Sequence, residues 1–287
     1  MSGELFKTLG LCFSANHLYY AAHNPEHSAR LEHVGCYDLN FNVARAIRTQ
    51  SDDYFPAIYE MLGRLKRDHQ FRHMRMCTVP DHECWTTLPK LVYDEPDERE
   101  AHLRILMNGV NRQSLETVWY DLSNRDFKFL VIRNKMIMDG FQRLTEHAHT
   151  ADFVSDHEIG QSWIQHAQHN GSFMMIHSVP GMISVSAYML GKLRGATYLQ
   201  YEEPEDLPYL WLMNARNLSW MNGFYDQTYV FGTQVKQISQ TLKGVWDHHT
   251  DINTFETLEN MQVGADEKTY SFSLESAFPA ILLSLNL

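Results

Sequence analysis

Two separate stretches of the chain share one pattern, in which three consecutive strands are followed by helices that alternate with single strands. The strands of the first stretch are predicted at Leu5–Phe13, His17–His23 and Leu31–Leu39, and those of the second at Phe173–Val179, Ile183–Leu190 and Leu193–Tyr201. A repeated βββαβα plan predicts an α/β fold with two similar lobes and a cleft between them. His169-Asn170-Gly171 is the best candidate linker, so we predict a first lobe over residues 1–169 and a second over 170–287.

Composition limits the kinds of partner. The 287 residues are 44% hydrophobic, which is enough apolar material for one large or two ordinary cores, and the length favours two. The formal charge of −11 disfavours a nucleic-acid or anionic-membrane surface, because these depend on Lys and Arg to neutralise phosphates. A basic partner is therefore favoured. No apolar run is long enough to span a bilayer and the N-terminus lacks a signal-peptide pattern, so we expect a cytoplasmic protein that does not span the membrane.

Further elements are predicted from apolar periodicity and turn-forming residues. In the first lobe the expected helices are Ser51–Phe71, with Ser51 as its N-cap, Glu95–Gly109, Met136–His147 and Asp156–Gln168. A strand is expected at His73–Pro80, and a hairpin at Thr117–Leu122 and Phe127–Arg133. In the second lobe a helix should follow the acidic run 202–206 and end near Asn222, before Gln227–Phe231 (strand), Gln234–Trp246 (helix), Ile252–Leu258 (strand) and Ser273–Leu285 (helix).

Three features together resemble the actin-like ATPase superfamily, whose lobes are ribonuclease H-like folds. They are the repeated three-strand opening, the strand that ends in Val230-Phe231-Gly232-Thr233 before a helix, and the closing segment Glu275-Ser276-Ala277-Phe278-Pro279-Ala280. The resemblance covers almost the whole chain and rests on the order of elements. In length and texture the chain is most similar to an uncharacterised Bacteroidetes family of this fold. More distantly, it resembles the PilM-type and GspL-type scaffolds of pilus and secretion machines.

The resemblance also implies where a nucleotide would be held. In nucleotide-hydrolysing members, the first hairpin of each lobe supplies an acidic residue that organises Mg²⁺ and glycines that let the backbone approach phosphate. Here Cys12 and His177 stand at the two acidic positions, and the adenosine-contacting turn, often Gly-Gly in relatives, is Phe231-Gly232-Thr233-Gln234. Since phosphoryl transfer needs the cation, we expect neither ATP nor Mg²⁺ as a cofactor; nucleotide binding without hydrolysis stays open. The degenerate cleft positions are Cys12, Ser14, His177, Ser178, Gly232 and Thr233.

Other catalytic motifs lack their required spacing. His157-Glu158-Ile159-Gly160-Gln161 has Gln where a zinc protease needs its second histidine, and the four cysteines include no CxxC pair. Gly191-Lys192-Leu193-Arg194-Gly195 lacks P-loop spacing and is interpreted as a hairpin turn. Neither a metal site nor a disulfide framework is expected. The histidines near the lobe junction are interpreted as a solvated or interfacial cluster: His147, His149, His157, His166, His169 and His177.

Aromatic and methionine side chains gather around the second-lobe helix that follows residue 206. These residue types are enriched where proteins bind each other, although packing against a sheet also requires them. Part of this cluster is predicted to form a partner surface, with Trp211, Trp220, Met221 and Tyr225 as its candidates.

The leading prediction is a non-catalytic actin-like scaffold or adaptor that binds a protein or peptide partner in a pilus- or secretion-type assembly. The expected partner is basic and membrane-associated, and no nucleic acid is expected. The alternative is a divergent nucleotide-binding enzyme, an ATPase or a sugar-kinase-like protein, with an altered site.

Overall fold

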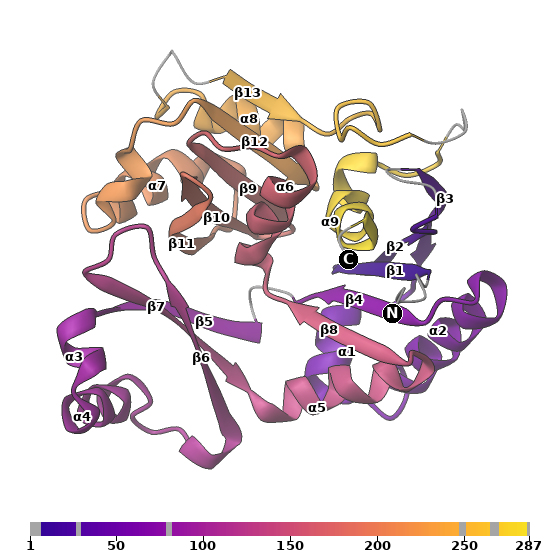
Figure 1. Cartoon of the computed structure of the whole chain (residues 1–287), viewed down its shortest axis with the longest axis horizontal. Helices are drawn as coiled ribbons and strands as arrows, with labels where there is room; N and C mark the ends of the chain where they lie inside the picture. The colour runs from indigo at the N-terminus through magenta and orange to yellow at the C-terminus, as the bar shows by residue number, and fades with distance from the viewer. Residues whose placement is uncertain (1–6, 27–29, 79–81, 247–250, 265–269, 286–287) are drawn as a thin grey trace.

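The computed structural model describes residues 7–26, 30–78, 82–246, 251–264 and 270–285, whose arrangement is shown in Figure 1. Two five-stranded sheets have the same strand order: β3-β2-β1-β4-β8 in the first and β11-β10-β9-β12-β13 in the second. In each sheet the three opening strands are antiparallel, and the other two strands continue in parallel from the first of the three. The predicted duplication and the α/β class with two lobes are confirmed.

Both three-strand openings lie close to their predicted positions. β1 and β9 are buried along their whole length, because each sheet is covered on both faces. The first sheet consists of β1 (Thr8–Ser14), β2 (His17–His23), β3 (Leu31–Asp38), β4 (His73–Cys77) and β8 (Thr150–Val154). The second consists of β9 (Phe173–Val179), β10 (Met182–Met189), β11 (Lys192–Gln200), β12 (Gln227–Gly232) and β13 (Asp251–Thr254).

Helices cover the outer face of each sheet. Leu9, Leu11 and Phe13 of β1 pack into a core with the apolar sides of α1, α2 and α5. On the second sheet, Met174 and Ile176 of β9 share a core with α7 and α8. These helices are α1 (Val43–Thr49), α2 (Phe55–His69), α5 (Lys135–Leu144), α7 (Leu207–Ala215) and α8 (Val235–Leu242).

Two further helices, α6 (Ile159–Ala167) and α9 (Leu274–Leu285), lie between the sheets. α6 leads from the first sheet into β9, while α9 contacts β12 of the second sheet and packs across β1, β2 and β4 of the first (Figure 1, yellow). Gly10 permits this close approach, since a β-carbon there would lie 1.9 Å from the carbonyl oxygen of Ala280. Helix α9 therefore packs directly on β1.

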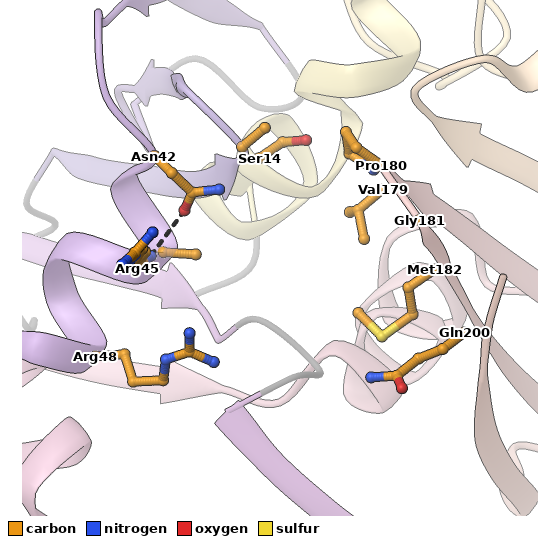
Figure 2. A pocket seen from close by; sticks show the side chains of 11 residues that line it. Ser14, Asn42, Arg45, Arg48, Val179, Pro180, Gly181, Met182 and Gln200 are labelled. Atoms are coloured by element: carbon orange, nitrogen blue, oxygen red, sulfur yellow. Dashed lines mark hydrogen bonds between the residues drawn. The ribbon is translucent and has the colours of Figure 1, made fainter. Parts of the chain in front are cut away.

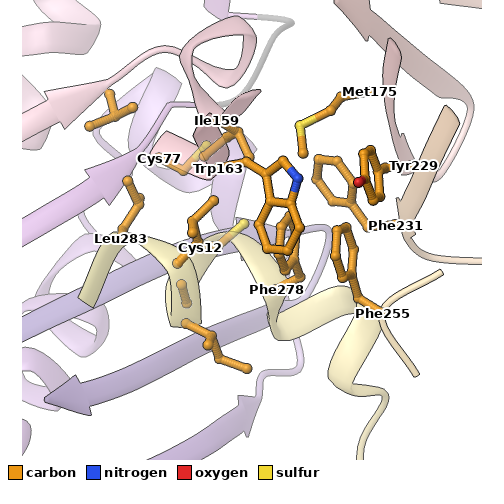
Figure 3. Close-up of a cluster of buried hydrophobic side chains, with 14 of the residues drawn as sticks. Cys12, Cys77, Ile159, Trp163, Met175, Tyr229, Phe231, Phe255, Phe278 and Leu283 are labelled. Atoms are coloured by element: carbon orange, nitrogen blue, oxygen red, sulfur yellow. The ribbon is translucent and has the colours of Figure 1, made fainter. Parts of the chain in front are cut away.

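The largest hydrophobic core of the described residues consequently lies between the lobes (Figure 3). Trp163 of α6 and Phe278 of α9 have ring centroids 5.9 Å apart, and Phe278 lies 4.9 Å from Phe231 of β12. Phe255 stacks on Phe278. Burial of each such side chain contributes roughly 1.5–3 kcal/mol, so separation of the lobes would be costly.

A third sheet of three strands, in the order β5-β7-β6, is inserted after β4. The predicted hairpin is confirmed as the antiparallel pair β6–β7. The loop after β6 is joined to the second lobe, because the Ser123 N–H donates a 2.7 Å hydrogen bond to the Leu193 carbonyl. The elements of this insertion are β5 (Glu83–Pro89), α3 (Lys90–Asp94), α4 (Pro96–Leu106), β6 (Leu115–Asp121) and β7 (Phe127–Asn134).

The structure corrects several local predictions. Ser51 is not an N-cap, because α2 begins at Phe55 with Pro56 in its first turn and Ser51 belongs to the preceding turn. The short helix α1 and the edge strand β8 were not predicted, since neither carries a long apolar pattern. β13 ends at Thr254, well before the predicted end at Leu258. Pro80, at the end of another predicted strand, lies outside the described residues. Within the described ranges, every helix is too short or too polar to span a bilayer.

Candidate functional site

The two positions that the resemblance assigned to altered metal ligands lie deep between the lobes. Cys12 on β1 is 2% exposed and His177 on β9 is 4% exposed. Cys12 pairs in register with Cys77 of β4, and Figure 3 shows both thiols beside α9. A molecule bound at the surface of the cleft would touch neither side chain.

A buried carboxylate, Asp156, connects these positions. Its Oδ1 atom lies 2.5 Å from Nδ1 of His177, and its Oδ2 atom accepts a hydrogen bond from the Ser184 hydroxyl. The Cys77 thiol donates to Oδ1 over 3.8 Å. The sequence pattern places Asp156 only at the start of a predicted helix, and nothing local in the sequence indicates that this start lies against β9 and β10.

Charges and hydrogen bonds within this cluster shift the pKa values of its members. Burial by itself lowers the pKa of His177, but the charge and the hydrogen bond of Asp156 outweigh burial and the pKa is raised overall. His177 and Asp156 therefore form a buried hydrogen-bonded pair, which becomes an ion pair when the imidazole is protonated. A hydrogen bond from Cys77 lowers the pKa of the Cys12 thiol against the effect of burial, while the pKa of Cys77 is raised well above its usual range. Both oxygens of Asp156 are engaged by protein groups and are not presented to a cation.

A second buried carboxylate, Glu83, fixes the third sheet to the first. It accepts hydrogen bonds from Arg133 Nε at 2.8 Å and from the Thr78 hydroxyl at 3.0 Å. It also accepts from Trp85 Nε1 at 2.8 Å and from the Ser155 hydroxyl. Because every partner comes from the junction where β4, β5, β7 and the start of α6 meet, Glu83 is a structural anchor.

The turn that the resemblance assigned to adenosine contact is closed by hydrogen bonds. The Thr233 N–H donates to the Ser178 carbonyl at 2.8 Å, and the Ser276 hydroxyl of α9 donates to the Gly232 carbonyl at 2.8 Å. Gly232 has a φ of 103°, and a β-carbon there would lie 2.1 Å from the Ser178 carbonyl oxygen. Ser178, Gly232 and Thr233 thus bind one another and α9.

Ser14, the remaining predicted position, lines an open cavity of about 450 Å³ between the lobes (Figure 2). The turn between β1 and β2 and helix α1 form one wall, and the turn between β9 and β10 forms the other. Arg45 and Arg48 lie on the α1 side, and Gln200 faces them. None of the 11 lining residues is Asp or Glu. The cavity could accept a small anion but offers no carboxylate to a metal.

Metal binding has no candidate elsewhere in the described part of the chain. No three His, Cys, Asp or Glu side chains among these residues are grouped so as to hold an ion.

Comparison with known proteins bears on the fold alone. No protein-family model matches the chain, and no curated protein matches it. A Bacteroides thetaiotaomicron protein with an actin-like ATPase fold and unknown function is similar at a TM-score of 0.52 and 15% identity, over 86% of this chain and 90% of that one. A chain of the PilM–PilN type IV pilus biogenesis complex has a TM-score of 0.65 at 12% identity, over 98% and 97%. The cytoplasmic domain of EpsL, an inner membrane component of the Vibrio cholerae type II secretion system, has a TM-score of 0.52 at 10% identity, over 97% and 93%.

The chain has the actin-like ATPase fold. The resemblance inferred from the order of elements is confirmed at this level.

Within this actin-like fold, the four residues predicted as a partner surface are core residues, which corrects that prediction. Helix α7 and the turn after it pack on the second sheet. The side chains on the apolar side of this segment are therefore buried in the core of the second lobe. The exposed apolar side chains of the region are different ones: Tyr209, Leu212, Met213 and Phe224. The buried ones are Trp211 (1% exposed), Trp220 (9%), Met221 (3%) and Tyr225 (5%).

The histidines near the lobe junction separate into two groups. His149 is exposed, and three others are half-buried. His157 and His177 are buried at the interface between the lobes. The ring of His157 lies among Trp85, Tyr120 and Phe129 at centroid distances of 5.2, 4.8 and 4.9 Å. Neither of its nitrogens has a hydrogen-bond partner among the described residues.

His157 should make the protein less stable in mild acid. Burial, assisted by the charge of Arg133, lowers its pKa from 6.5 to about 3. Below pH 6.5 the imidazole of His157 therefore binds a proton in the unfolded chain but not in the folded chain. The free energy of unfolding consequently falls as the pH falls. Between pH 7 and pH 5 this single group should remove about 2 kcal/mol from the free energy of unfolding. Urea denaturation at both pH values should show a smaller loss, by that amount, in His157→Phe. Equal losses in the two proteins would contradict the assignment.

Proposed function

We propose that the protein is a non-catalytic scaffold that binds protein partners on the outside of a closed actin-like body. One observation carries the proposal: the positions at which hydrolysing relatives place metal-binding carboxylates hold Cys12 and His177, both sealed inside a hydrogen-bonded cluster. A buried carboxylate whose two oxygens are both hydrogen-bonded by protein groups supports a specific packing arrangement rather than turnover.

The connections between the lobes support the same conclusion. Helix α6, helix α9 and the third sheet each join the two halves, and the core between them is apolar. Nucleotide-driven cycles require lobes that open and close around the ligand. We therefore propose that residues 1–169 and 170–287, although they are separate lobes, act as one rigid unit.

The relatives suggest a place of action. One similar structure is a pilus biogenesis complex, and another is the cytoplasmic domain of an inner membrane component of a secretion system. By analogy, the protein works on the cytoplasmic side of a membrane-associated assembly and has a partner there.

The exposed side of α7 supports a basic partner. Tyr209, Leu212 and Met213 are 66%, 52% and 42% exposed and lie three and four positions apart, so they form one apolar stripe on the helix. We call these three residues the α7 stripe. An acidic run precedes it: Glu202, Glu203, Glu205 and Asp206. A segment that offers Lys or Arg around an apolar anchor would match both features.

The second candidate function is nucleotide or phosphate binding without hydrolysis. The cavity between the two hairpin turns favours it, because Arg45 and Arg48 line a space large enough for a small anion. Thermal stability distinguishes the two functions.

Addition of ATP and Mg²⁺ should leave the melting temperature unchanged, because a ligand stabilises a protein only in proportion to its occupancy of the native state. A ligand at a hundred times its Kd would add about 2.7 kcal/mol, which corresponds to a shift of several degrees. Mg²⁺ alone is the control. A shift that disappears in Arg45→Ala would establish the second candidate function instead.

A photoreactive amino acid at position 212 should crosslink to the partner in cells. Leu212 is half-exposed in the α7 stripe, and Ile105 on α4, 73% exposed, is the matched control position. We expect a crosslink from position 212 only, to a segment in which basic residues surround an apolar one. Crosslinks from both positions, or to an acidic segment, would contradict the assignment of the α7 stripe.

A further inference from the structure

We propose that a groove between the third sheet and the second lobe binds a protein segment in which acidic side chains flank an apolar anchor. This would be a second docking site, with a basic lining where the α7 stripe has an acidic run beside it, and it rests on the proposed scaffold function. We call it the hairpin groove, because its walls are the β6–β7 turn and the β10–β11 turn.

The hairpin groove has the shape of a binding site. Its volume is about 630 Å³, and Leu122 and Trp220, at 6% and 9% exposed, form its floor. The hydrogen bond from Ser123 N–H to the Leu193 carbonyl ties one wall to the other, so the groove exists without a ligand. A preformed site avoids part of the ordering cost of association.

Trp220, one of the lining residues, packs closely against Gly195 of β11. A β-carbon at this position would lie 2.5 Å from Nε1 of Trp220, so the indole rests directly on the β11 backbone. Well-packed aromatic residues of this kind often carry most of the energy of an interface. The sequence predicts Trp220 as part of an exposed surface. It is instead buried, and it lies beneath the proposed docking site.

The charge of the groove defines its occupant. Arg125, Lys192 and Arg194 line it, and none of its 14 lining residues is Asp or Glu. Asp121, at the end of β6, is held by Lys128 at 2.5 Å. In a chain of net charge −11, this basic lining is a local exception. Complementarity therefore selects an acidic segment.

Leu190, at the rim of the groove, has a backbone conformation that is unfavourable for leucine. Leu190 has a φ of 50° and Gly191 a φ of 76°, the conformation of a two-residue hairpin turn that prefers Asn-Gly. Leu190 is nevertheless 80% exposed. A bulky residue in the left-handed region is strained, and strain of this kind is characteristic of ligand-binding positions. Leu190 provides the apolar contact at the mouth of the groove.

The test uses short linear peptides selected from a phage-displayed library on the full-length protein. The most enriched sequence is then synthesised with a fluorescent label, and its affinity is measured by polarisation. We expect Asp or Glu around a large apolar residue. Leu190→Asn and Lys192→Glu should each weaken binding by about tenfold or more. Leu190→Asn should keep or raise the melting temperature, because Asn suits the turn better than Leu. A purely structural role for Leu190 would instead lower it.

Matched controls are Ile105→Asn and Lys243→Glu, which alter an exposed apolar residue and an exposed lysine outside the groove. Binding that is insensitive to the groove variants would overturn the hairpin groove but leave the scaffold function intact. Failure to enrich any acidic peptide would also overturn it, and the ATP and crosslinking measurements would still decide the scaffold function separately. If the protein dimerises and Leu190→Asn abolishes the dimer, the occupant is a second copy and the proposed segment is wrong.

Discussion

The contact between α9 and β1 is the constraint on which the rest of the structure depends. The helix comes last in the chain but lies on the first strand, and Gly10 is the residue that lets the two backbones approach. Once α9 is seated there, Phe278 completes the aromatic core shared with Trp163 and Phe231. The layer between the sheets is therefore filled by side chains and is not an open cleft. It holds the largest hydrophobic core of the described residues.

The chemistry between the lobes follows from that closure. Carboxylates sealed in such a layer must satisfy their hydrogen bonds with neighbouring groups, since an unpaired buried charge is expensive. Asp156 does so with His177, Ser184 and Cys77, and Glu83 does so at the corner of the third sheet. These two carboxylates therefore hold elements together. The surfaces proposed to bind partners lie on the outside: the α7 stripe, which follows an acidic run, and the hairpin groove, which has a basic lining. A body with two such surfaces is suited to bridging two partners.

Sequence patterns predicted the fold well because its strands are long and apolar. The two three-strand openings and the closing helix could be located to within a few residues, and their repetition was enough to suggest the superfamily. Short or polar elements such as α1 and β8 carry too few apolar residues to be recognised. Which side chains of α7 are exposed could not be predicted, because composition cannot tell which side of the helix faces the sheet: Trp211 is buried while Leu212 is exposed. The link between Asp156 and His177 joins two lobes, and no local spacing encodes it.

Hydrogen exchange on the native protein, with and without ATP and Mg²⁺, tests the closed body most directly. Amides of buried elements exchange either through local opening or only when the whole domain unfolds. A closed body predicts that β1, β9 and α9 exchange only at the rate of global unfolding, and that ATP changes no segment. Faster exchange of α9 and α6 than of the two sheets, or protection by ATP of the turns that flank the cavity between the lobes, would show that the lobes open and would contradict it.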